Sequence, residues 1–143
     1  MSVNYPPVAF HFRVEFTNLK SDYQFQSVSG LSIELETEEI AEGGENRFKH
    51  RLPVRTKFPN LVLKRGLLTD SALIRWCRDA VENYKIVPTD LTISLLNEEH
   101  EPLMTWNVVH AWPLKWSMPD FNAEESKMVI ETIELAYNYF RIQ

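Results

Sequence analysis

The chain has 143 residues, of which 44% are hydrophobic and 12% aromatic, and this predicts one globular domain that buries on the order of two-thirds of the surface of the unfolded chain. A net charge of -5 argues against a general binder of nucleic acid or of anionic membranes. The single cysteine, Cys77, excludes an internal disulfide and fits a reducing cytoplasm, and neither a secretory signal nor a run of ~18 apolar residues is present.

Alternation of apolar and polar residues predicts strands in the first part of the chain. Between residues 8 and 16 every even-numbered residue is apolar, which is typical of a half-buried strand. Residues 17–23 are polar and turn-like, and residues 25–28 resume a short strand. Gly30 is expected to bend the chain before the next strand.

The segment that follows carries opposite charges in its two halves. Residues 34–45 contain six glutamates and no Lys or Arg, whereas residues 47–57 contain five Lys or Arg, one His and no acid. The acidic half alternates like a strand from Leu31, Gly43-Gly44 can turn the chain, and the prolines of the basic half favour an extended arm or edge. Two interpretations stay open: a hairpin within one chain, or charges that let copies meet head to tail in rings or stacks.

One helix is predicted after Gly66. Apolar residues recur there at spacings of three and four, which predicts a buried stripe. Thr69 or Asp70 can cap the start of this helix, and Pro88 blocks its continuation. The stripe consists of Leu73, Trp76, Cys77, Ala80, Val81 and Tyr84. Cys77 is therefore expected to be a buried small hydrophobe with a raised thiol pKa.

The last part of the chain is predicted to be mostly strand. Residues 90–97 and 104–111 alternate and form an antiparallel pair around a polar tip, and residues 115–122 are expected to bend. Residues 125–142 fit either a helical stripe or a strand face, and their β-branched and aromatic content favours strand. The prediction is about seven strands around one helix.

The chemistry of an enzyme is missing from the sequence. Its four glycines do not form a phosphate-binding loop, and no serine lies in a nucleophile elbow. The four histidines lack paired metal-ligand spacing, so each is expected to serve the surface or the packing. The glutamates around His100 can attract a cation, but a solvated hairpin tip is the favoured interpretation. We assign no catalytic, cofactor-binding or metal-binding residue.

Three pieces of the sequence carry a resemblance: Val28-Ser29-Gly30-Leu31, the Gly43-Gly44 loop and residues 61–66. With the whole segment 25–66 they resemble the tail-tube protein family of contractile phages and of related bacterial contractile injection systems. The helix, residues 91–97, the stretch 102–116 and the ending 130–137 continue this resemblance over nearly the whole chain.

The resemblance implies a mainly β fold, a β-sandwich or small barrel with one flanking α-helix, in which inner sheets join into a continuous barrel in a hexameric ring. Rings stack into the inner tube of a contractile injection system, a conduit that is expelled by sheath contraction and carries neither catalysis nor a cofactor. Residues 1–143 then form a single tail-tube domain with an extended hairpin or arm at about 38–58.

The resemblance also implies partners and a location. The partners are other copies of the chain in a homo-hexamer, a sheath protein, baseplate and spike proteins, and an effector or DNA in the lumen. Assembly takes place in the cytoplasm, and the finished particle is extracellular, cell-anchored or a virion. The alternatives are the virion tail tube of a contractile phage, a first-ring initiator or adaptor above the spike, and, more remotely, a ligand-binding β-barrel with a closed apolar cavity.

Inter-subunit contacts are predicted in the charged segment. We expect Arg47, Lys49 and Arg51 to pair with acidic groups of residues 34–45 in a neighbouring copy. The predicted contact residues are Glu34, Glu36, Glu38, Glu39, Glu42, Gly43, Gly44, Glu45, Arg47, Lys49 and Arg51.

Overall fold

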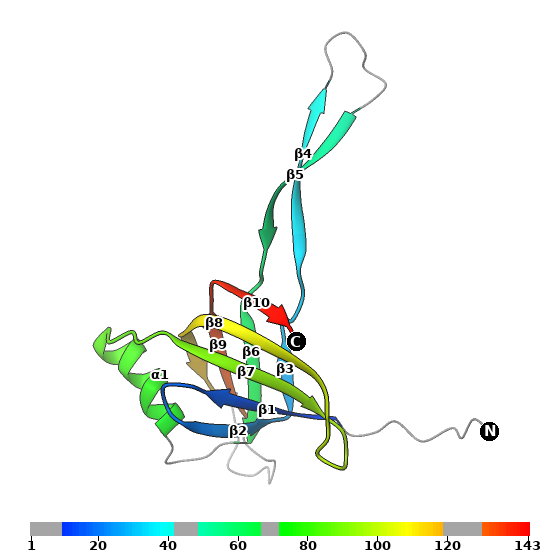
Figure 1. The fold of residues 1–143 in the computed structure, drawn as a ribbon. Coiled ribbons are helices and arrows are strands. Elements are labelled where there is room, and N and C mark those ends of the chain that lie inside the picture. The colour runs from blue at the N-terminus through cyan, green and yellow to red at the C-terminus, as the bar shows by residue number, and fades with distance from the viewer. Residues whose placement is uncertain (1–9, 42–48, 67–71, 119–129) are drawn as a thin grey trace, which may run out of the picture.

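The computed structural model describes residues 10–41, 49–66, 72–118 and 130–143, which contain ten strands and one helix (Figure 1). The fold is thus mainly β, as predicted. In chain order the elements are β1 His11–Phe16, β2 Ser21–Phe25, β3 Ser27–Ser29, β4 Glu34–Ala41, β5 Lys49–Lys57, β6 Leu61–Gly66, α1 Ala72–Asn83, β7 Thr89–Leu96, β8 Pro102–Ser117, β9 Ile130–Ala136 and β10 Tyr139–Ile142.

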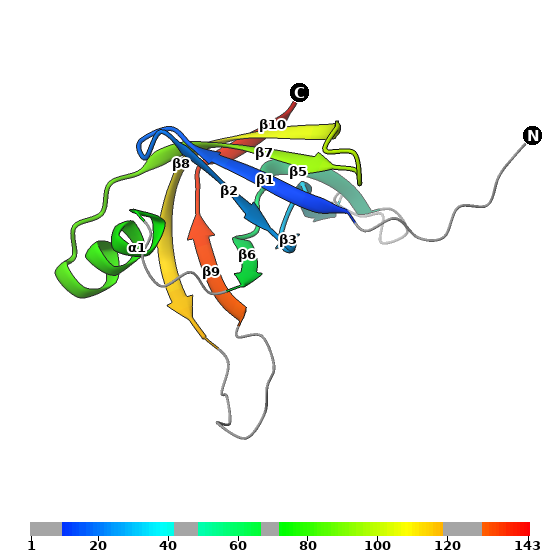
Figure 2. The same ribbon diagram turned by 90° about the horizontal axis from the view of Figure 1, so that it is seen from below.

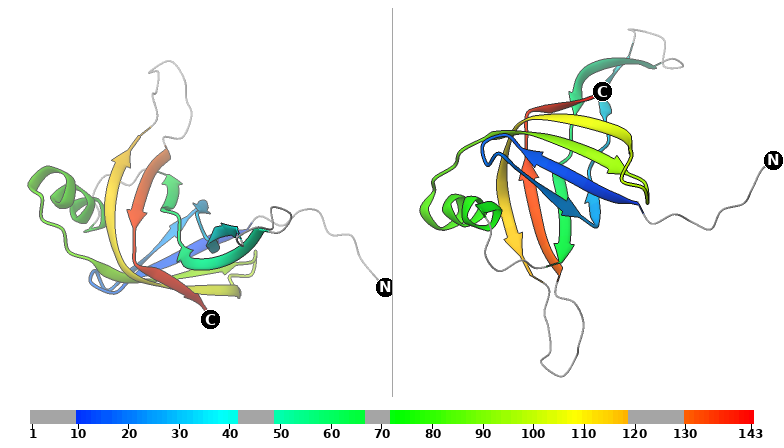
Figure 3. Two further views of the ribbon diagram at one scale, coloured as in Figure 1. Left: turned by 90° about the horizontal axis from the view of Figure 1, so that it is seen from above. Right: turned by 60° about the horizontal axis from the view of Figure 1, so that its bottom comes forward.

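The eight described strands of the body are joined in one antiparallel series, which divides into two sheets that share the long strand β8. Its first half pairs with β7 and β10, and β7 continues through β1 to β2. Its second half pairs with β9, which continues through β6 to β3. Because β2 leads into β3 through Gln26, whose N–H donates to the carbonyl of Lys64 at 2.8 Å, the sheets also meet at their other edge. The result is a small barrel whose two sheets cross steeply (Figures 2 and 3).

The corner in β8 lies at His110. This residue has a φ of 56°, and its backbone N–H donates to Asp90 Oδ1 at 3.1 Å. Trp106 and Val108 point into the barrel before the corner, and Ala111 does so after it. The left-handed residue therefore moves the set of inward-facing side chains from even-numbered to odd-numbered positions. The two halves of β8 can then each turn one face to the interior of the barrel.

Apolar side chains from both sheets fill the inside of the barrel. α1 packs against β8 on the outside of the barrel (Figure 2). Trp76 Nε1 of this helix donates to the carbonyl of Val87, in the segment between α1 and β7, at 2.8 Å. Cys77 is fully buried, as predicted, and burial raises the pKa of its thiol to about 12. The core residues are Val14, Phe16, Phe25, Leu61, Leu63, Leu73, Trp76, Cys77, Leu91, Ile93, Trp106, Val108, Ala111, Ile133, Leu135 and Phe140.

The helix differs from its prediction at the end. α1 stops at Asn83, because Tyr84 takes a φ of 54° and the N–H of Lys85 donates back to the carbonyl of Asp79 at 3.0 Å. Tyr84 and Val81, both assigned to the buried stripe, are exposed. The predicted capping residues 69 and 70 lie outside the described residues. α1, the one helix in the described ranges, does not have the length and apolar character needed to cross a membrane.

The prediction of about seven strands was too low. The polar stretch 17–23 is a turn only to residue 20, because β2 already begins at Ser21 opposite Phe16. The C-terminal stretch is strand, as favoured, but it is divided at Asn138, whose N–H donates to the carbonyl of Val109 at 2.9 Å. Local backbone bonds of this kind carry no signal in the alternation of apolar residues.

One predicted strand face and one predicted bend also need correction. Phe10 was placed on the inward face of the first strand but is more than half exposed, whereas Val14 and Phe16 on that face are buried. The bend predicted from residue 115 is not seen up to residue 117, because β8 continues with Pro113 opposite Leu135 and a register shift directly after it. Proline is tolerated there because the irregularity removes the need for its missing N–H.

Candidate functional site

Strands β4 and β5 form an arm that projects from the barrel (Figure 1). They pair with each other in a two-stranded antiparallel sheet and with no other described strand. The basic half of the charged segment therefore folds back on the acidic half, as the hairpin interpretation predicts. An isolated two-stranded hairpin is marginally stable in water, so the arm is the element of this structure that most needs a partner.

Opposite charges face each other along the arm. The register places Glu34 opposite Lys57, Glu36 opposite Arg55, and Glu39 opposite Arg51. Arg55 Nε donates to Glu36 Oε2. This hydrogen bond and the positive charge of Arg55 lower the pKa of Glu36, and the same bond and the negative charge of Glu36 raise the pKa of Arg55. Arg51 Nε lies 3.7 Å from Glu39 Oε1. The side chains are exposed, so water competes for these ion pairs and they stabilise the hairpin only slightly.

A bulge divides the arm. Glu36 faces Arg55, but the next residue, Thr37, faces Pro53, so Val54 is an extra residue in β5. Side chains alternate along the regular strand β4, which places Glu36 and Glu39 on opposite faces. Both faces of the arm therefore carry one Glu–Arg pair, and the arm offers charge in two directions.

Apolar side chains are exposed beside these charges. Ile33, Leu35, Leu52 and Val54 retain between 47% and 59% of their accessible surface. Single exposed apolar residues are ordinary on protein surfaces, but three in one projecting hairpin, with Ile33 directly before it, form a mixed apolar and charged surface. Such a surface is typical of a contact that is completed by another protein.

The root of the arm is fixed to the barrel. Gly30 has a φ of 95°, and a Cβ atom there would lie 2.1 Å from the carbonyl oxygen of Asn60, so glycine is required. This confirms the predicted bend. The ring of Phe58 lies edge-on to Tyr137 and Phe140, with centroid distances of 6.0 and 5.2 Å. The direction of the arm is thus set by close packing on both strands that enter it.

Only some of the predicted contact residues lie in the part of the chain that the structure describes. Glu36, Glu39 and Arg51 have partners within the arm, and Lys49 faces Ala41 across it. Glu34 and Glu38 are exposed. Glu42, Gly43, Gly44, Glu45 and Arg47 lie outside the described residues. Contact with a neighbouring copy stays a prediction for the whole set.

Sequence reasoning missed several residues of the arm. Arg55 and Lys57 were seen as basic but were not assigned a partner, although the hairpin register places each of them opposite a glutamate. The exposed apolar residues and the aromatic contact of Phe58 were also missed. Counting back from the Gly43-Gly44 turn gives a clue to the charge pairs, but the bulge at Val54 changes that count by one residue.

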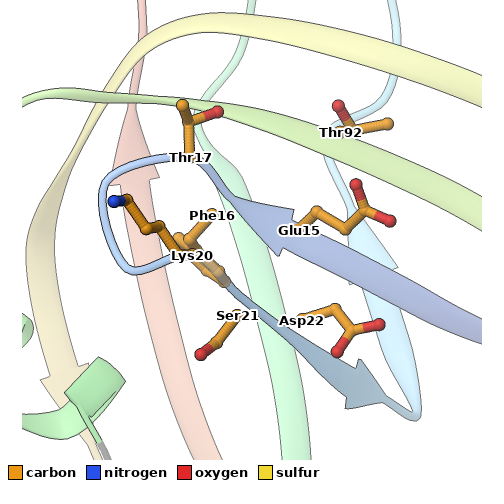
Figure 4. Close-up of a pocket in the computed structure, with 7 residues that line it drawn as sticks. All are labelled: Glu15, Phe16, Thr17, Lys20, Ser21, Asp22 and Thr92. Atoms are coloured by element: carbon orange, nitrogen blue, oxygen red, sulfur yellow. The ribbon is translucent and has the colours of Figure 1, made fainter.

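A surface groove of about 290 Å³ lies at the turn between β1 and β2 (Figure 4). Its carboxylates, Glu15 and Asp22, face each other across the strand pair and are exposed, as is Lys20. An open polar groove of this kind does not exclude water, which argues against catalysis there. Among the described residues no group of three or more His, Cys, Asp or Glu side chains could hold a metal ion.

The chain matches known proteins over nearly its whole length. The family model described as T4-like virus tail tube protein gp19 matches residues 8–141. No curated protein sequence matches the chain.

Solved structures match as well. A chain in the cryo-EM structure of the anti-feeding prophage (AFP) baseplate, 6-fold symmetrised, is 32% identical, with 100% of this chain and 97% of that chain covered and a TM-score of 0.82. A chain in the extended-state sheath–tube complex of PVC, an extracellular contractile injection system, is 31% identical, with coverages of 99% and 93% and a TM-score of 0.78.

A more distant match is Hcp1 from Flavobacterium johnsoniae, which is 14% identical over 92% of this chain and 93% of that chain, with a TM-score of 0.60. At that identity the likeness concerns the fold alone. The mainly β fold agrees with the match over residues 8–141, and the chain belongs to the family of T4-like virus tail tube proteins, as its sequence resemblance predicted.

Proposed function

We propose that the chain is the repeating protomer of the inner tube of a contractile injection system. Six copies close a ring, the rings stack, and the tube serves as a conduit. The observation that carries this proposal is the arm, which exposes charged and apolar side chains together on a hairpin that needs a partner. The similar chains from a six-fold symmetrised baseplate and from a sheath–tube complex support it.

The proposal includes partners and a location. A sheath protein surrounds the tube, baseplate and spike proteins begin it, and an effector or DNA passes through the lumen. The protein folds in the cytoplasm and then becomes part of an extracellular, cell-anchored or virion particle. It performs no catalysis. The similar chains come from a baseplate and from the sheath–tube complex of an extracellular injection system, which supports the sheath, the baseplate and the extracellular particle.

Electron microscopy of the purified full chain, with mass measurement in solution, tests assembly directly. We expect six-fold rings or stacked tubes. A monomer that persists at high concentration, also after addition of baseplate proteins as a nucleus, contradicts the proposal. A closed apolar cavity with a bound ligand would then favour the small ligand-binding barrel.

Charge reversal tests the role of the arm. We propose that Arg47, Lys49 and Arg51 pair with acidic residues of a neighbouring copy, so Arg47→Glu with Arg51→Glu is expected to block stacking and to leave the fold intact. Circular dichroism checks the fold, and microscopy measures tube length. Lys115→Glu, an exposed basic residue on the barrel, is the matched control. Full-length tubes from the double variant would show that the assignment is wrong.

A first-ring initiator is the second candidate, and the match to a baseplate structure favours it. An initiator is present in one ring per particle, whereas a tube protomer repeats along the tube. Quantitative mass spectrometry of intact particles distinguishes them through the ratio of this chain to the sheath protein.

A further inference from the structure

Two histidines that are distant in the sequence meet at one end of the barrel. His11 begins β1, and His100 lies in the turn between β7 and β8. Nε2 of His11 and Nδ1 of His100 are 3.0 Å apart, and the rings cross at 76° with centroids 4.9 Å apart. Each histidine alone was expected to serve only the surface or the packing, because their spacing in the sequence gives no hint of this pair.

The turn holds His100 in an unusual backbone conformation. His100 has a φ of 62°, and its N–H donates to the carbonyl of Asn97 at 3.0 Å. The side chain of Asn97 accepts two further bonds, from the N–H groups of Glu99 and Glu101, each at 2.9 Å. A left-handed non-glycine residue costs free energy, and it persists here because these hydrogen bonds hold the turn on both sides of it. The imidazole is therefore presented to β1 by a fixed frame.

The distance between the two nitrogens suits a shared metal ion. Metal–imidazole bonds are about 2.0–2.1 Å long, so two ligands at a right angle place their nitrogens about 2.9 Å apart, whereas tetrahedral ligands are about 3.3 Å apart. The observed 3.0 Å agrees with the right angle. Square-planar and tetragonal sites with nitrogen and oxygen ligands are typical of Cu²⁺ and Ni²⁺.

The surroundings of the pair favour a cation. The turn carries the carboxylates of Glu98, Glu99 and Glu101, and all three residues are exposed, as is His100. Arg13 lies two residues after His11 on the same face of β1 and is the nearest positive charge along that strand. Its guanidinium lies 3.7 Å from Glu15, which offsets its charge.

We propose that His11 and His100 form a binding site for a divalent ion of the Cu²⁺ and Ni²⁺ class, with water completing the coordination. The ion replaces the proton that otherwise joins the two rings, and it fixes the β7–β8 turn to the start of β1. The proposal does not rest on the tube function or on the contacts of the arm.

Isothermal titration of the full chain, prepared without a polyhistidine tag, with Ni²⁺ and with Cu²⁺ tests the site. We expect one ion per chain. His11→Gln and His100→Asn should each weaken binding at least about tenfold, because each removes a ligand. Asn is chosen at position 100 because it tolerates a positive φ. Electron paramagnetic resonance of the Cu²⁺ complex should show two nitrogen ligands.

His110→Asn is the matched control, since His110 is another exposed histidine with a positive φ, 56°, and it lies at the corner within β8, away from the β7–β8 turn. Its affinity for both ions should stay within about twofold of the parent chain. The proposal is overturned if no saturable binding occurs, if the double variant of His11 and His100 binds as tightly as the parent, or if His110→Asn weakens binding equally.

Discussion

Two Glu–Arg pairs of the same chemistry lie in opposite settings in this molecule. Arg65 of β6 faces Glu131 of β9 inside the barrel, where the side chains are 3% and 0% exposed and Nη2 lies 3.4 Å from Oε1. Arg55 of β5 faces Glu36 of β4 on the arm, where they are 74% and 36% exposed. Each pair is directly opposed across antiparallel strands. The surroundings, and not the residue types, therefore decide what each pair does.

The buried pair belongs to the barrel interior. Its guanidinium lies over the rings of Tyr23 and Phe25, with its carbon 5.1 and 5.4 Å from their centroids. Removing two charges from water is costly, so the pair stabilises the fold only while both members are present. It also links β6 to β9 at a position where a slip of either strand would leave a charge alone. The arm pair has water as an alternative partner and imposes no such condition.

Removal of one member of the buried pair is the test of this comparison with the largest expected effect on stability. Glu131→Gln leaves the guanidinium of Arg65 buried without its counter-charge, and we expect the free energy of unfolding to fall by about 3–5 kcal/mol. Urea unfolding, at a protein concentration where light scattering detects no tubes, measures it. The double variant Arg65→Met with Glu131→Leu is the control, because it removes both charges and should recover most of the loss. A single variant as stable as the parent contradicts the assignment.

The joint between barrel and arm gives the next largest effect. Gly30→Ala forces an L-residue to a φ of 95° and places its Cβ against the carbonyl of Asn60, so a loss on the order of 2 kcal/mol is expected. Ser29→Ala, at the exposed neighbouring position, should change stability by less than about 0.5 kcal/mol. Urea unfolding compares the two variants. If Gly30→Ala unfolds like Ser29→Ala, the close approach at the root is not as described.

The barrel was more predictable than the arm for a physical reason. Its strands bury one face, so the alternation in residues 90–97 and 104–111 predicted the antiparallel pair that β7 and β8 form. The same alternation carries information about Arg65 and Glu131, which continue the inward positions of Leu61 and Leu63 in β6 and of Ile133 and Leu135 in β9. Burial of a charge was not read from that pattern because charged residues are ordinarily exposed.

The arm has no buried face, so periodicity could not place its residues. Its hairpin was one of two open interpretations, and its bulge at Val54 depends on backbone pairing that side-chain patterns do not record. The meeting of His11 with His100 is a long-range consequence of the β1–β7 pairing and of a left-handed turn residue. Contacts between copies depend on a second chain, so the charge split and the family resemblance could suggest them but could not give their geometry.

The thiol of Cys77 makes burial in the barrel testable through the pH dependence of the free energy of unfolding. Burial, and secondarily the charge of Glu131, raises its pKa from 9.0 to about 12, so the unfolded chain loses this proton first as the pH rises. The stabilisation is complete below about pH 9 and is lost between about pH 9 and 12. Compared with Cys77→Ala, the parent should lose up to about 1.4 kcal/mol more per pH unit in that window. Urea unfolding between about pH 8.5 and 10.5 tests this, and parallel slopes would show that the thiol is accessible.

The smallest effect on folding is expected from the arm pair. Glu36→Gln removes the exposed ion pair with Arg55, and the urea midpoint should stay unchanged at neutral pH, because water replaces the lost partner. The pKa of Glu36 is lowered, so any contribution exists above about pH 4.5 and is lost as the pH falls through the lowered pKa. We therefore also expect parent and variant to have the same midpoint at pH 3.

The same variant should act on assembly instead. Loss of one negative charge from the arm is expected to raise the protein concentration at which tubes form, and added salt should reduce the difference from the parent because it screens exposed charges. Sedimentation across a concentration series measures it, with Glu98→Gln on the β7–β8 turn as the control. If Glu36→Gln instead lowers the urea midpoint as much as Glu131→Gln does, the arm is part of the folding unit. Its charges then stabilise the folded chain, and contact with a neighbouring copy is not their main role.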